Sequence, residues 1–298
     1  MKILITGGAG FIGSHVVDAC AVRGDEIYII DNLSTGNSEN ISQHRDNPRV
    51  RFLEADICNQ AKIRSIFEEF RPEVVFHLAA QINVRESIKN PQHDVEVNIL
   101  GTLNVLEAMR ASECHHMIFS STGGAMFWGD NPPYSEEQSA NPETPYGISK
   151  RSVEFLLGFY ERQYGINSAI LRYSNVYWPR QNAQWEAGVV SIFLDKIKNN
   201  QAPIIFGDGN QTRDFIHVDD VVSANLHALD QKLTGIYHVG TGIETSVNDL
   251  WKILAGQSSI IPTYWPALWE IQRSALDSTK LQKTGWEIKR QLSDLGKE

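Results

Sequence analysis

The chain has 298 residues, with 27 Lys plus Arg against 36 Asp plus Glu, and a formal net charge of -9 at pH 7. This length can bury a large core, and we expect one main domain with a smaller dependent lobe. The acidic balance argues against a nucleic-acid-binding surface.

Cysteine usage and hydropathy narrow the class of protein further. Cys20, Cys58 and Cys114 lie far apart without a CxxC spacing, so we predict neither a disulfide framework nor a zinc or other metal site. No apolar run approaches the roughly 18 residues that span a bilayer, and the chain starts directly on a predicted strand, which leaves no room for a signal peptide. These features predict a cytoplasmic protein that does not bind membranes.

The first thirty residues predict a strand, a glycine turn and a helix. Ile3-Leu4-Ile5 leads into Thr6-Gly7-Gly8-Ala9-Gly10-Phe11-Ile12-Gly13, and a helical pattern of apolar residues follows. Gly7 and Gly10 allow a tight turn and close approach of a pyrophosphate, while Gly13 lets the helix pack against the strand. The free N–H groups of the helix N-terminus favour phosphate, so the turn predicts dinucleotide binding.

The next two strands carry acids at their ends. Residues 26–30 form a strand that ends in Asp31, whose carboxylate can accept hydrogen bonds from an adenosine ribose and would repel a 2′-phosphate. NAD is therefore favoured over NADP. The turn-rich segment 32–37 either wraps that ribose or is a plain loop, and Asp56, after a strand at 50–54, can accept from the adenine amino group.

Continuing along the chain, a helix at 60–70 should end before Pro72. Residues 74–78 are an apolar run typical of a strand buried on both faces, and small residues follow at Ala79-Ala80. We interpret His77 in this strand as hydrogen-bonded internally, since a ligand or base is rarer there. Repeated strand–helix alternation predicts an α/β fold, a Rossmann-type doubly wound parallel sheet.

A helix is predicted from about 91 to 110, and Asn98 interrupts its apolar stripe. A buried amide needs partners, so we expect Asn98 to brace the catalytic strand, with cofactor contact as the second interpretation. That strand, at 117–120, leads into Ser121-Thr122-Gly123-Gly124.

Tyr146 and Lys150 are four residues apart in the helix that Pro145 opens, which puts both on one helix face. A nearby ammonium and a positive nicotinamide ring both favour the phenolate, so Tyr146 can take a proton from a substrate hydroxyl while hydride leaves for NAD. Lys150 can also bond the nicotinamide ribose, and Thr122 can hold the substrate oxygen. The predicted cofactor-binding residues are Gly7, Gly10, Phe11, Ile12, Gly13, Asp31, Asn32, Ser34, Thr35, Gly36, Asp56, Ile57, Leu78, Ala79, Ala80, Gln81, Asn98, Tyr146, Lys150, Tyr173 and Ser174.

Taken together, the stretches TGGAGFIGSH, DNLSTG, HLAAQ, SSTGGA, PYGISK, LRYSNVY and FGDGNQTRDFIHVDD make the chain resemble the extended short-chain dehydrogenases/reductases. Within them it resembles the UDP-glucose 4-epimerase-like group of NAD-dependent sugar-nucleotide epimerases and dehydratases. The resemblance implies tightly held NAD, oxidation of a sugar C4 hydroxyl, rotation of the keto sugar and return of hydride to its other face. It implies a catalytic triad of Thr122, Tyr146 and Lys150, with Ser121 able to replace Thr122. It also implies a homodimer joined through helices at about 93–110 and 147–164.

The resemblance also helps to distinguish dehydration from epimerisation. Dehydratases of this family place an Asp-Glu pair directly after the triad hydroxyl, because they need an acid and a base for water elimination. This chain has Gly123-Gly124 there, which disfavours dehydration and leaves epimerisation or simple redox chemistry.

The organisation expected is a Rossmann domain over residues 1–173 and a mainly substrate-binding lobe over 174–298, with some segments returning to the first domain. Thr122 and Tyr146 serve the substrate as well as the chemistry, and the resemblance adds Asn175 and Arg213 as diphosphate contacts, with Val189 and Ile205 as further substrate contacts. Arg213 could instead form a surface ion pair with the acid beside it, and residues 204–206 either flank a uracil ring or form a core strand.

Several positions depart from the family pattern. Trp128, Trp178, Trp185 and Trp269 stand where glycines are usual, and Ala267 replaces an arginine that normally grips the diphosphate. Either surface loops have drifted, or the pocket is reshaped for a different acceptor. The primary hypothesis is a nucleotide-sugar 4-epimerase of the UDP-glucose/UDP-galactose type. The alternatives are an NAD-dependent dehydrogenase or reductase on another polyol or keto compound, and a non-catalytic NAD-binding regulator.

Overall fold

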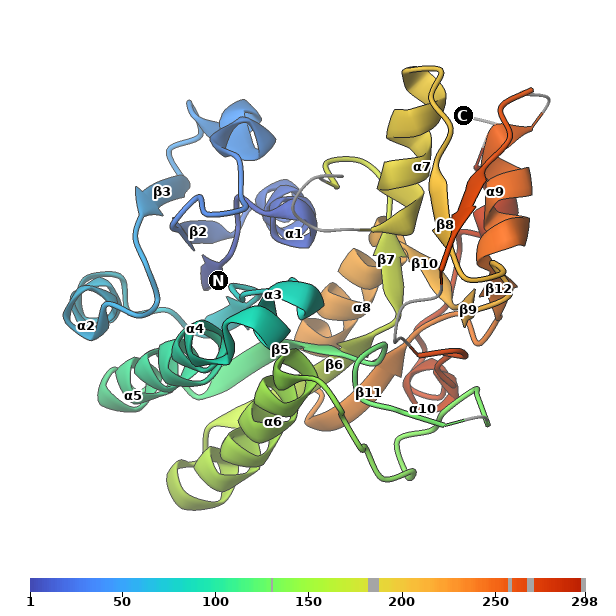
Figure 1. Cartoon of the computed structure of the whole chain (residues 1–298). Helices are drawn as coiled ribbons and strands as arrows, with labels where there is room; N and C mark the ends of the chain where they lie inside the picture. The colour runs from blue at the N-terminus through green and yellow to red at the C-terminus, as the bar shows by residue number, and fades with distance from the viewer. Residues whose placement is uncertain (130, 182–187, 257–258, 267–270, 296–298) are drawn as a thin grey trace.

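The protein is built around one large parallel sheet with helices on both faces (Figure 1). The computed structural model describes residues 1–129, 131–181, 188–256, 259–266 and 271–295. Within these residues the sheet has seven strands in the order β11-β6-β5-β4-β1-β2-β3, all paired in parallel. The strands are β1 (Lys2–Thr6), β2 (Glu26–Asp31), β3 (Val50–Glu54), β4 (Val74–His77), β5 (His116–Thr122), β6 (Asn167–Tyr173) and β11 (Gly235–Val239). The predicted Rossmann-type doubly wound sheet is confirmed.

The strand order reverses direction beside β1. Ile3 of β1 pairs with Ile27 of β2 on one side and with Val74 of β4 on the other. In open α/β sheets a crevice opens beyond the carboxyl ends of the strands where the order reverses. The glycine turn follows β1 and the segment 78–81 follows β4, so both lie at this crevice.

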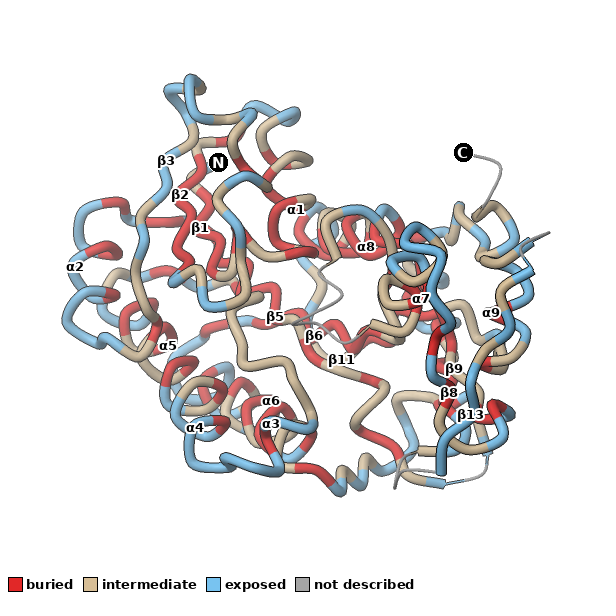
Figure 2. Tube along the Cα trace, turned by 45° about the horizontal axis from the view of Figure 1, so that its top comes forward, coloured by how far each residue is buried: buried red, intermediate tan, exposed pale blue. Residues whose placement is uncertain are grey.

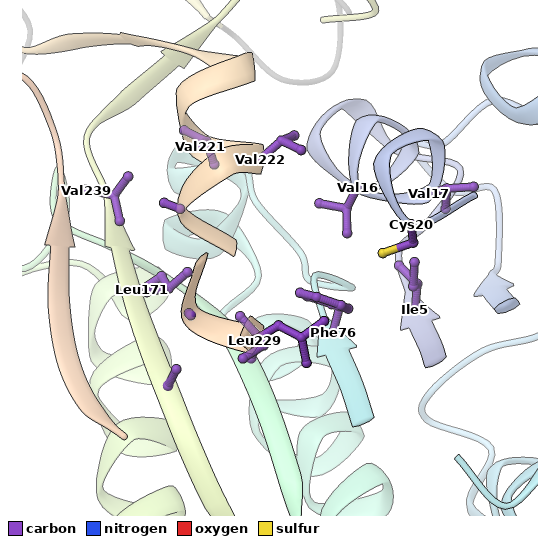
Figure 3. Packing of buried hydrophobic residues seen from close by; sticks show 14 of the residues in the cluster. Ile5, Val16, Val17, Cys20, Phe76, Leu171, Val221, Val222, Leu229 and Val239 are labelled. Atoms are coloured by element: carbon purple, nitrogen blue, oxygen red, sulfur yellow. The ribbon is translucent and has the colours of Figure 1, made fainter. Parts of the chain in front are cut away.

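Helices cover both faces because side chains alternate along each strand. Ile3 and Ile5 belong to one core cluster and Leu4 to the other. Helices α1 and α8 pack on the first face, and Figure 3 shows Val16 of α1 and Val222 of α8 on the facing sides of the two helices. Helices α2, α5 and α6 cover the second face, and the buried residues follow the sheet in Figure 2. The helical segments of this part are α1 (Phe11–Val22), a 3-10 helix (Ser38–His44), α2 (Gln60–Phe70), α3 (Val84–Lys89), α4 (Pro91–Val95), η2 (Glu96–Gly101), α5 (Thr102–Ala111), α6 (Pro145–Tyr164) and α8 (Val218–Asp230).

Of two predicted helices, one ends where expected and the other is divided into segments. Helix α2 ends at Phe70, before Pro72, as predicted, and Arg71 between them takes a left-handed conformation with φ of 49°. The helix expected from about 91 to 110 is three successive segments, because η2 is a π-helical stretch between α4 and α5. Such π segments are frequent at functional sites, and this one contains Asn98.

Among the described residues, three two-stranded sheets lie outside the large one, and they pair β7 with β10, β9 with β12 and β8 with β13. Tyr177, Phe193 and Leu250 belong to their separate core cluster. Helix α8 and strand β11 lie on the large sheet instead, so this part of the chain returns to it. The elements here are β7 (Asn175–Tyr177), α7 (Val189–Lys198), β8 (Ile204–Phe206), β9 (Thr212–Arg213), β10 (Phe215–His217), β12 (Thr245–Ser246), α9 (Val247–Ala255), β13 (Thr263–Trp265), α10 (Thr279–Gln282) and a 3-10 helix (Leu292–Asp294).

No helix among the described residues is both long enough and apolar enough to cross a membrane.

Candidate active site

The glycine turn after β1 presses directly against the segment after β4. Gly7 has φ of +71°, which favours glycine, and a Cβ added to it would lie 2.6 Å from the backbone nitrogen of Ala79. A Cβ on Gly13 would collide with the carbonyl of Gly7, so this glycine lets α1 start immediately beside the turn. The turn therefore has the close packing that was predicted for it.

The N-terminus of α1 has the features of a phosphate site. Its N-cap is Gly10, and no side chain caps the helix. The first backbone N–H groups of a helix lack intrahelical acceptors, and an uncapped end leaves them for an anion. Phe11 and Ile12 pack their side chains on the core cluster, so only their backbone atoms could serve a phosphate.

Asp31 lies at the end of β2 and is buried beside this turn. Its carboxylate accepts hydrogen bonds from the backbone nitrogen of Ala9 at 3.0 Å and of Leu33 at 2.9 Å. Burial raises the pKa of Asp31, and these backbone hydrogen bonds oppose that shift. Gly36 packs against this carboxylate, since a Cβ there would lie 2.8 Å from Asp31 Oδ1. The residues expected around a ribose thus gather at one place.

The neighbouring positions form a second group. Asn32 donates from Nδ2 to Asp56 Oδ2 at 2.8 Å and accepts from the backbone nitrogen of Ser34 at 3.0 Å. Ile57 is buried, and its side chain touches the position of Gly101. Asp56 is therefore held next to the loop after β2, where the predicted adenosine contacts lie.

Asn98 holds the segment after β4 by both sides of its amide. Its Oδ1 accepts from the backbone nitrogen of Gln81 at 2.9 Å, and its Nδ2 donates to the carbonyl of Gln81 at 3.0 Å. The prediction that Asn98 braces the catalytic strand β5 is thus corrected, because the amide braces the loop that follows β4. The reason is that η2 packs beside this loop.

The predicted catalytic pair, Tyr146 and Lys150, lies on the first turns of α6. Thr144 caps the helix by accepting from the backbone nitrogen of Gly147 at 3.2 Å, and the backbone nitrogen of Tyr146 donates to Ser87 Oγ of α3 at 3.2 Å. Lys150 is buried and donates from Nζ to the carbonyl of Ser120 at 2.9 Å. Since Ser120 lies in β5 two residues before Thr122, this bond fixes the helix to the catalytic strand.

The hydroxyl of Thr122 lies close enough to that of Tyr146 to favour the phenolate. Removal from water raises the pKa of Tyr146, Asp94 raises it further, and the Thr122 hydroxyl acts in the opposite direction. Burial lowers the pKa of Lys150 to about 8, while Asp94 and Glu154 act in the opposite direction. The predicted triad is therefore brought together, but its own protein surroundings do not lower the pKa of the phenol.

Ser121 has a different environment from the one predicted. It is buried, and its Oγ donates to Glu154 Oε1 at 2.7 Å. Successive side chains of a strand point to opposite faces, so Ser121 points into the interior when Thr122 points to Tyr146. The expectation that Ser121 could replace Thr122 is corrected on this ground.

Beyond β6 the backbone brings further predicted residues to the crevice. Ser174 Oγ is buried without a hydrogen-bond partner among the described residues, as expected of a group that awaits a ligand. Tyr173 is buried and its hydroxyl bonds Asn225 at 3.0 Å, which limits any cofactor contact of this residue to its backbone. Asn175 lies beside the turn after Thr122, because a Cβ on Gly124 would be 3.6 Å from Asn175 Oδ1.

The strand expected to flank a uracil ring, β8, directs Ile205 into the core and Phe206 toward Arg85. Ile205 is 1% exposed and belongs to the core cluster of the smaller lobe, which leaves only its backbone for a substrate. Phe206 instead lies under the guanidinium of Arg85 from α3, 5.5 Å from its ring centroid. Val189 begins α7 and packs on the same cluster.

Arg213 lies in β9 and donates to the carbonyl of Thr212 at 2.8 Å. The adjacent Asp214 is buried, and its carboxylate accepts from Thr241, Gly242 and Leu276. The carboxylate of Asp214 therefore holds backbone groups of these residues and, among the described residues, does not form a surface ion pair.

Two of the four tryptophan departures, Trp128 and Trp178, lie among the described residues. Trp178 has φ of 119°, and its ring centroid lies 5.9 Å from that of His217 and 6.4 Å from that of Tyr177. It lines a small hollow that Arg290 also lines, between β7, β10 and the C-terminal segment. Trp128 is partly buried, and Trp185, Ala267 and Trp269 lie outside the described residues.

Asp94 is a site residue that the sequence reasoning missed. It is fully buried in α4, and its Oδ1 accepts from Gln81 Nε2 at 2.8 Å and from Asn98 Nδ2 at 3.0 Å. Its Oδ2 has no partner among the described residues. The signal was available, because Asp94 stands four residues before Asn98 and so shares its helix face. Separately, the described residues hold no group of three His, Cys, Asp or Glu arranged for a metal ion.

Comparison with known proteins agrees with this geometry. The profile of the NAD dependent epimerase/dehydratase family matches residues 3–240. A Methanocaldococcus jannaschii protein, whose name as a UDP-glucose 4-epimerase is provisional, is 48% identical over 292 residues, covering 96% of this chain and 92% of that protein. The crystal structure of a Thermotoga maritima UDP-glucose 4-epimerase with UDP-glucose superposes with a TM-score of 0.93 at 43% identity, covering 99% of this chain and 96% of that one. A Thermus thermophilus UDP-glucose 4-epimerase in complex with NAD gives a TM-score of 0.91 at 37% identity, with coverages of 99% and 96%.

Proposed function

Because the chain belongs to the NAD-dependent epimerase/dehydratase family, we propose that it interconverts nucleotide sugars that differ at C4, with UDP-glucose and UDP-galactose as the substrate pair. The observation that carries this proposal is the meeting of Thr122, Tyr146 and Lys150 at the carboxyl end of β5. Gly123 and Gly124 after Thr122 supply no acid and base for elimination of water, which favours epimerisation over dehydration.

NAD is the cofactor, and the residues present fit it. The uncapped N-terminus of α1 would hold the pyrophosphate, Asp31 the adenosine ribose, and Lys150 the nicotinamide ribose. Ser174 Oγ, which is buried without a partner among the described residues, follows β6 at the same carboxyl edge of the sheet. When bound, NAD supplies the acceptor for the hydride that leaves C4 and adds positive charge to the site.

The residues of this chain then handle the proton. Tyr146 takes the proton of the C4 hydroxyl as the C4–H bond breaks, which leaves a 4-keto sugar, and gives it back when hydride returns to the opposite face of C4. Thr122 holds the oxygen on which charge changes, and Lys150 keeps a positive charge near the phenol. Asn175 and Arg213 would bind the diphosphate, and the segments outside the large sheet, mainly within 174–298, would form the substrate lobe.

The test is an assay with UDP-galactose and purified enzyme, in which UDP-glucose and free NADH are both measured. We expect UDP-glucose to form with no accumulation of NADH, since an epimerase recycles its cofactor. Tyr146→Phe should reduce the rate by at least about a hundredfold, the scale of lost general acid–base catalysis, whereas Tyr164→Phe, at the exposed end of the same helix, should not.

Other outcomes would point to other functions. Release of one NADH per substrate would support a dehydrogenase, and full biological activity of Tyr146→Phe would support a non-catalytic NAD-binding protein. A KM in the micromolar range for both sugars would exclude the idea that the tryptophans reshape the pocket for another acceptor.

We also propose that the protein is a homodimer joined through α5 and α6. Ile148, Phe155 and Phe159 follow one stripe of α6 and are 50%, 64% and 42% exposed, and Leu100 of η2 is 51% exposed. Large apolar side chains in such a stripe mark a helix face that packs on another surface. A hollow of about 440 Å³ between these helices, lined by Leu100, Leu103 and Tyr160 among others, could receive side chains of a second copy.

A further inference from the structure

We propose that His77 is a positioning residue of the cofactor site: held as one neutral tautomer with its proton on Nε2, it fixes both ends of the loop 79–81 beside the glycine turn. His77 is the last residue of β4 and is 1% exposed. Its ring lies between Thr6 at the end of β1 and Thr102 at the start of α5. The proposal rests on the proposed contact between this loop and NAD.

The tautomer follows from the hydrogen-bond partners of Thr102. Its Oγ1 lies 2.7 Å from the carbonyl oxygen of Asn98, and since a carbonyl only accepts, the hydroxyl proton of Thr102 is used there. The same Oγ1 lies 2.9 Å from His77 Nε2, so at this contact the hydroxyl accepts and Nε2 carries a proton. No other assignment satisfies both bonds.

The opposite ring nitrogen must then accept. Burial lowers the pKa of His77 to about 3, and the charge of Lys150 acts in the same direction, so the ring carries one proton near neutral pH. His77 Nδ1 therefore accepts from Thr6 Oγ1 at 2.7 Å. Thr6 Oγ1 in turn accepts from the backbone nitrogen of Ala79 at 3.2 Å.

These bonds close a circuit around the loop. It runs from Ala79 through Thr6, His77 and Thr102 to Asn98, whose side chain holds both backbone groups of Gln81. The two ends of the loop are thereby tied to β1 and to η2 through one imidazole. Gly7 packs on this loop, so the loop position sets one wall of the dinucleotide crevice.

A wall held in place before binding raises affinity because the protein does not have to order it when the ligand arrives. An aliphatic or phenyl side chain at 77 could fill the volume, but it would leave the Thr6 and Thr102 hydroxyls without this partner. The imidazole is suited to the position because it accepts at one end and donates at the other.

The first experiment measures the tautomer directly. Long-range ¹H–¹⁵N spectra of selectively labelled wild-type enzyme should show His77 as the Nε2–H form without titration between pH 5.5 and 8.5. A proton on Nδ1, or a midpoint in that range, would overturn the proposal.

The second experiment divides the circuit with two amide substitutions. In His77→Asn the side-chain oxygen can replace Nδ1 as the acceptor for Thr6, and in His77→Gln the amide nitrogen can replace Nε2 as the donor to Thr102. His77→Phe removes both. We expect the Kd of NAD, measured by calorimetry on enzyme stripped of cofactor, to rise about tenfold or more in His77→Phe and by less in each amide variant.

Matched controls distinguish a specific loss of NAD affinity from a general loss of stability. Val75→Ala removes buried volume from the same strand without touching the circuit, so it should lower the melting temperature but leave the Kd of NAD unchanged. Should His77→Phe fail to fold, Thr6→Val and Thr102→Val break the same bonds with little change in shape, and each should weaken NAD binding. Wild-type Kd in the circuit variants, or equal weakening in Val75→Ala, would refute a positioning role.

This outcome is separable from the proposed function. Absence of epimerase activity in a wild-type enzyme that binds NAD would refute the substrate assignment and leave the role of His77 standing. Unchanged NAD affinity in His77→Phe, with normal epimerase activity in the wild type, would refute the role of His77 and leave the substrate assignment standing.

Discussion

Tyr146 and Lys150 show how far one residue's chemistry depends on its neighbours. The lysine was expected to favour the phenolate, yet removal from water is the largest effect on Tyr146 and raises its pKa. Asp94 raises it further, because a buried negative charge opposes a second one. Lowering the pKa of Tyr146 therefore requires the positive charge of bound nicotinamide, which this chain does not supply by itself.

Asp94 should set the pH range of catalysis. It raises the pKa of both Lys150 and Tyr146, so Asp94→Asn should lower both values. A lower pKa of Lys150 means that the ammonium is lost at lower pH, which moves the alkaline limb of the profile to lower pH. A lower pKa of Tyr146 moves the acid limb in the same direction. We expect the whole profile of kcat against pH, measured from pH 5.5 to 9.5, to move down by about one unit.

The exposed Asp46→Asn provides the control for this shift, because it removes the same charge away from the site. A profile of Asp94→Asn that moves to higher pH, or that stays in place, would show that this carboxylate does not act on the catalytic pair.

At the scale of elements, a buried ion pair joins α6 to the sheet. Glu154 of α6 accepts from Arg172 Nε at 2.8 Å and Arg172 Nη2 at 2.6 Å, and both side chains are at most 2% exposed. Burial alone would raise the pKa of Glu154, but the charge and hydrogen bonds of Arg172 hold it below its ordinary value. This contribution to stability is present at neutral pH and is lost as the pH falls through that lowered pKa.

Removing one partner leaves the other as an unpaired buried charge. Glu154→Gln should therefore lower the free energy of unfolding by about 3 kcal/mol, measured by urea denaturation. Glu68→Gln, which breaks the exposed pair with Arg64, should change it by less than about 0.5 kcal/mol. Equal effects in the two variants would contradict the role assigned to the buried pair.

The π-helical segment is a second case at this scale. Apolar spacing predicted one helix over 91–110, and the helical character is confirmed, but the extra residue per turn in η2 was not visible in the pattern. Sequence periodicity follows the average turn, whereas a π segment is selected by the contacts of a few side chains. Here Asn98 and Thr102 make those contacts with the loop after β4 and with β4 itself.

At the scale of the whole molecule, the proposed dimer can be tested through the α6 stripe. Phe155→Asp with Phe159→Asp places two charges where two apolar faces would meet, and should convert the protein to a monomer of 33.5 kDa by light scattering. Ile261→Asp, at an apolar residue that is 79% exposed in the smaller lobe, should leave the assembly unchanged. A wild-type protein that is already monomeric would refute the dimer.

The sequence by itself determined the features whose geometry is local. The glycine turn, the acid at the end of β2 and the Tyr146–Lys150 spacing each lie within a few residues of backbone, where φ/ψ limits and helix periodicity decide the conformation. Strand–helix alternation was enough to predict the parallel sheet, because right-handed crossovers leave few other topologies.

Only the tertiary structure decided which groups meet across elements. The side chain of Ser121 points inward, where it bonds Glu154, the partner of Arg172. Asn98 contacts the loop after β4 rather than β5, and the side chain of Ile205 lies in the core. Asp94 and the tautomer of His77 belong to the same class. Such contacts join residues far apart in the chain, and their distances depend on how helices pack on the sheet, which no local pattern of residues specifies.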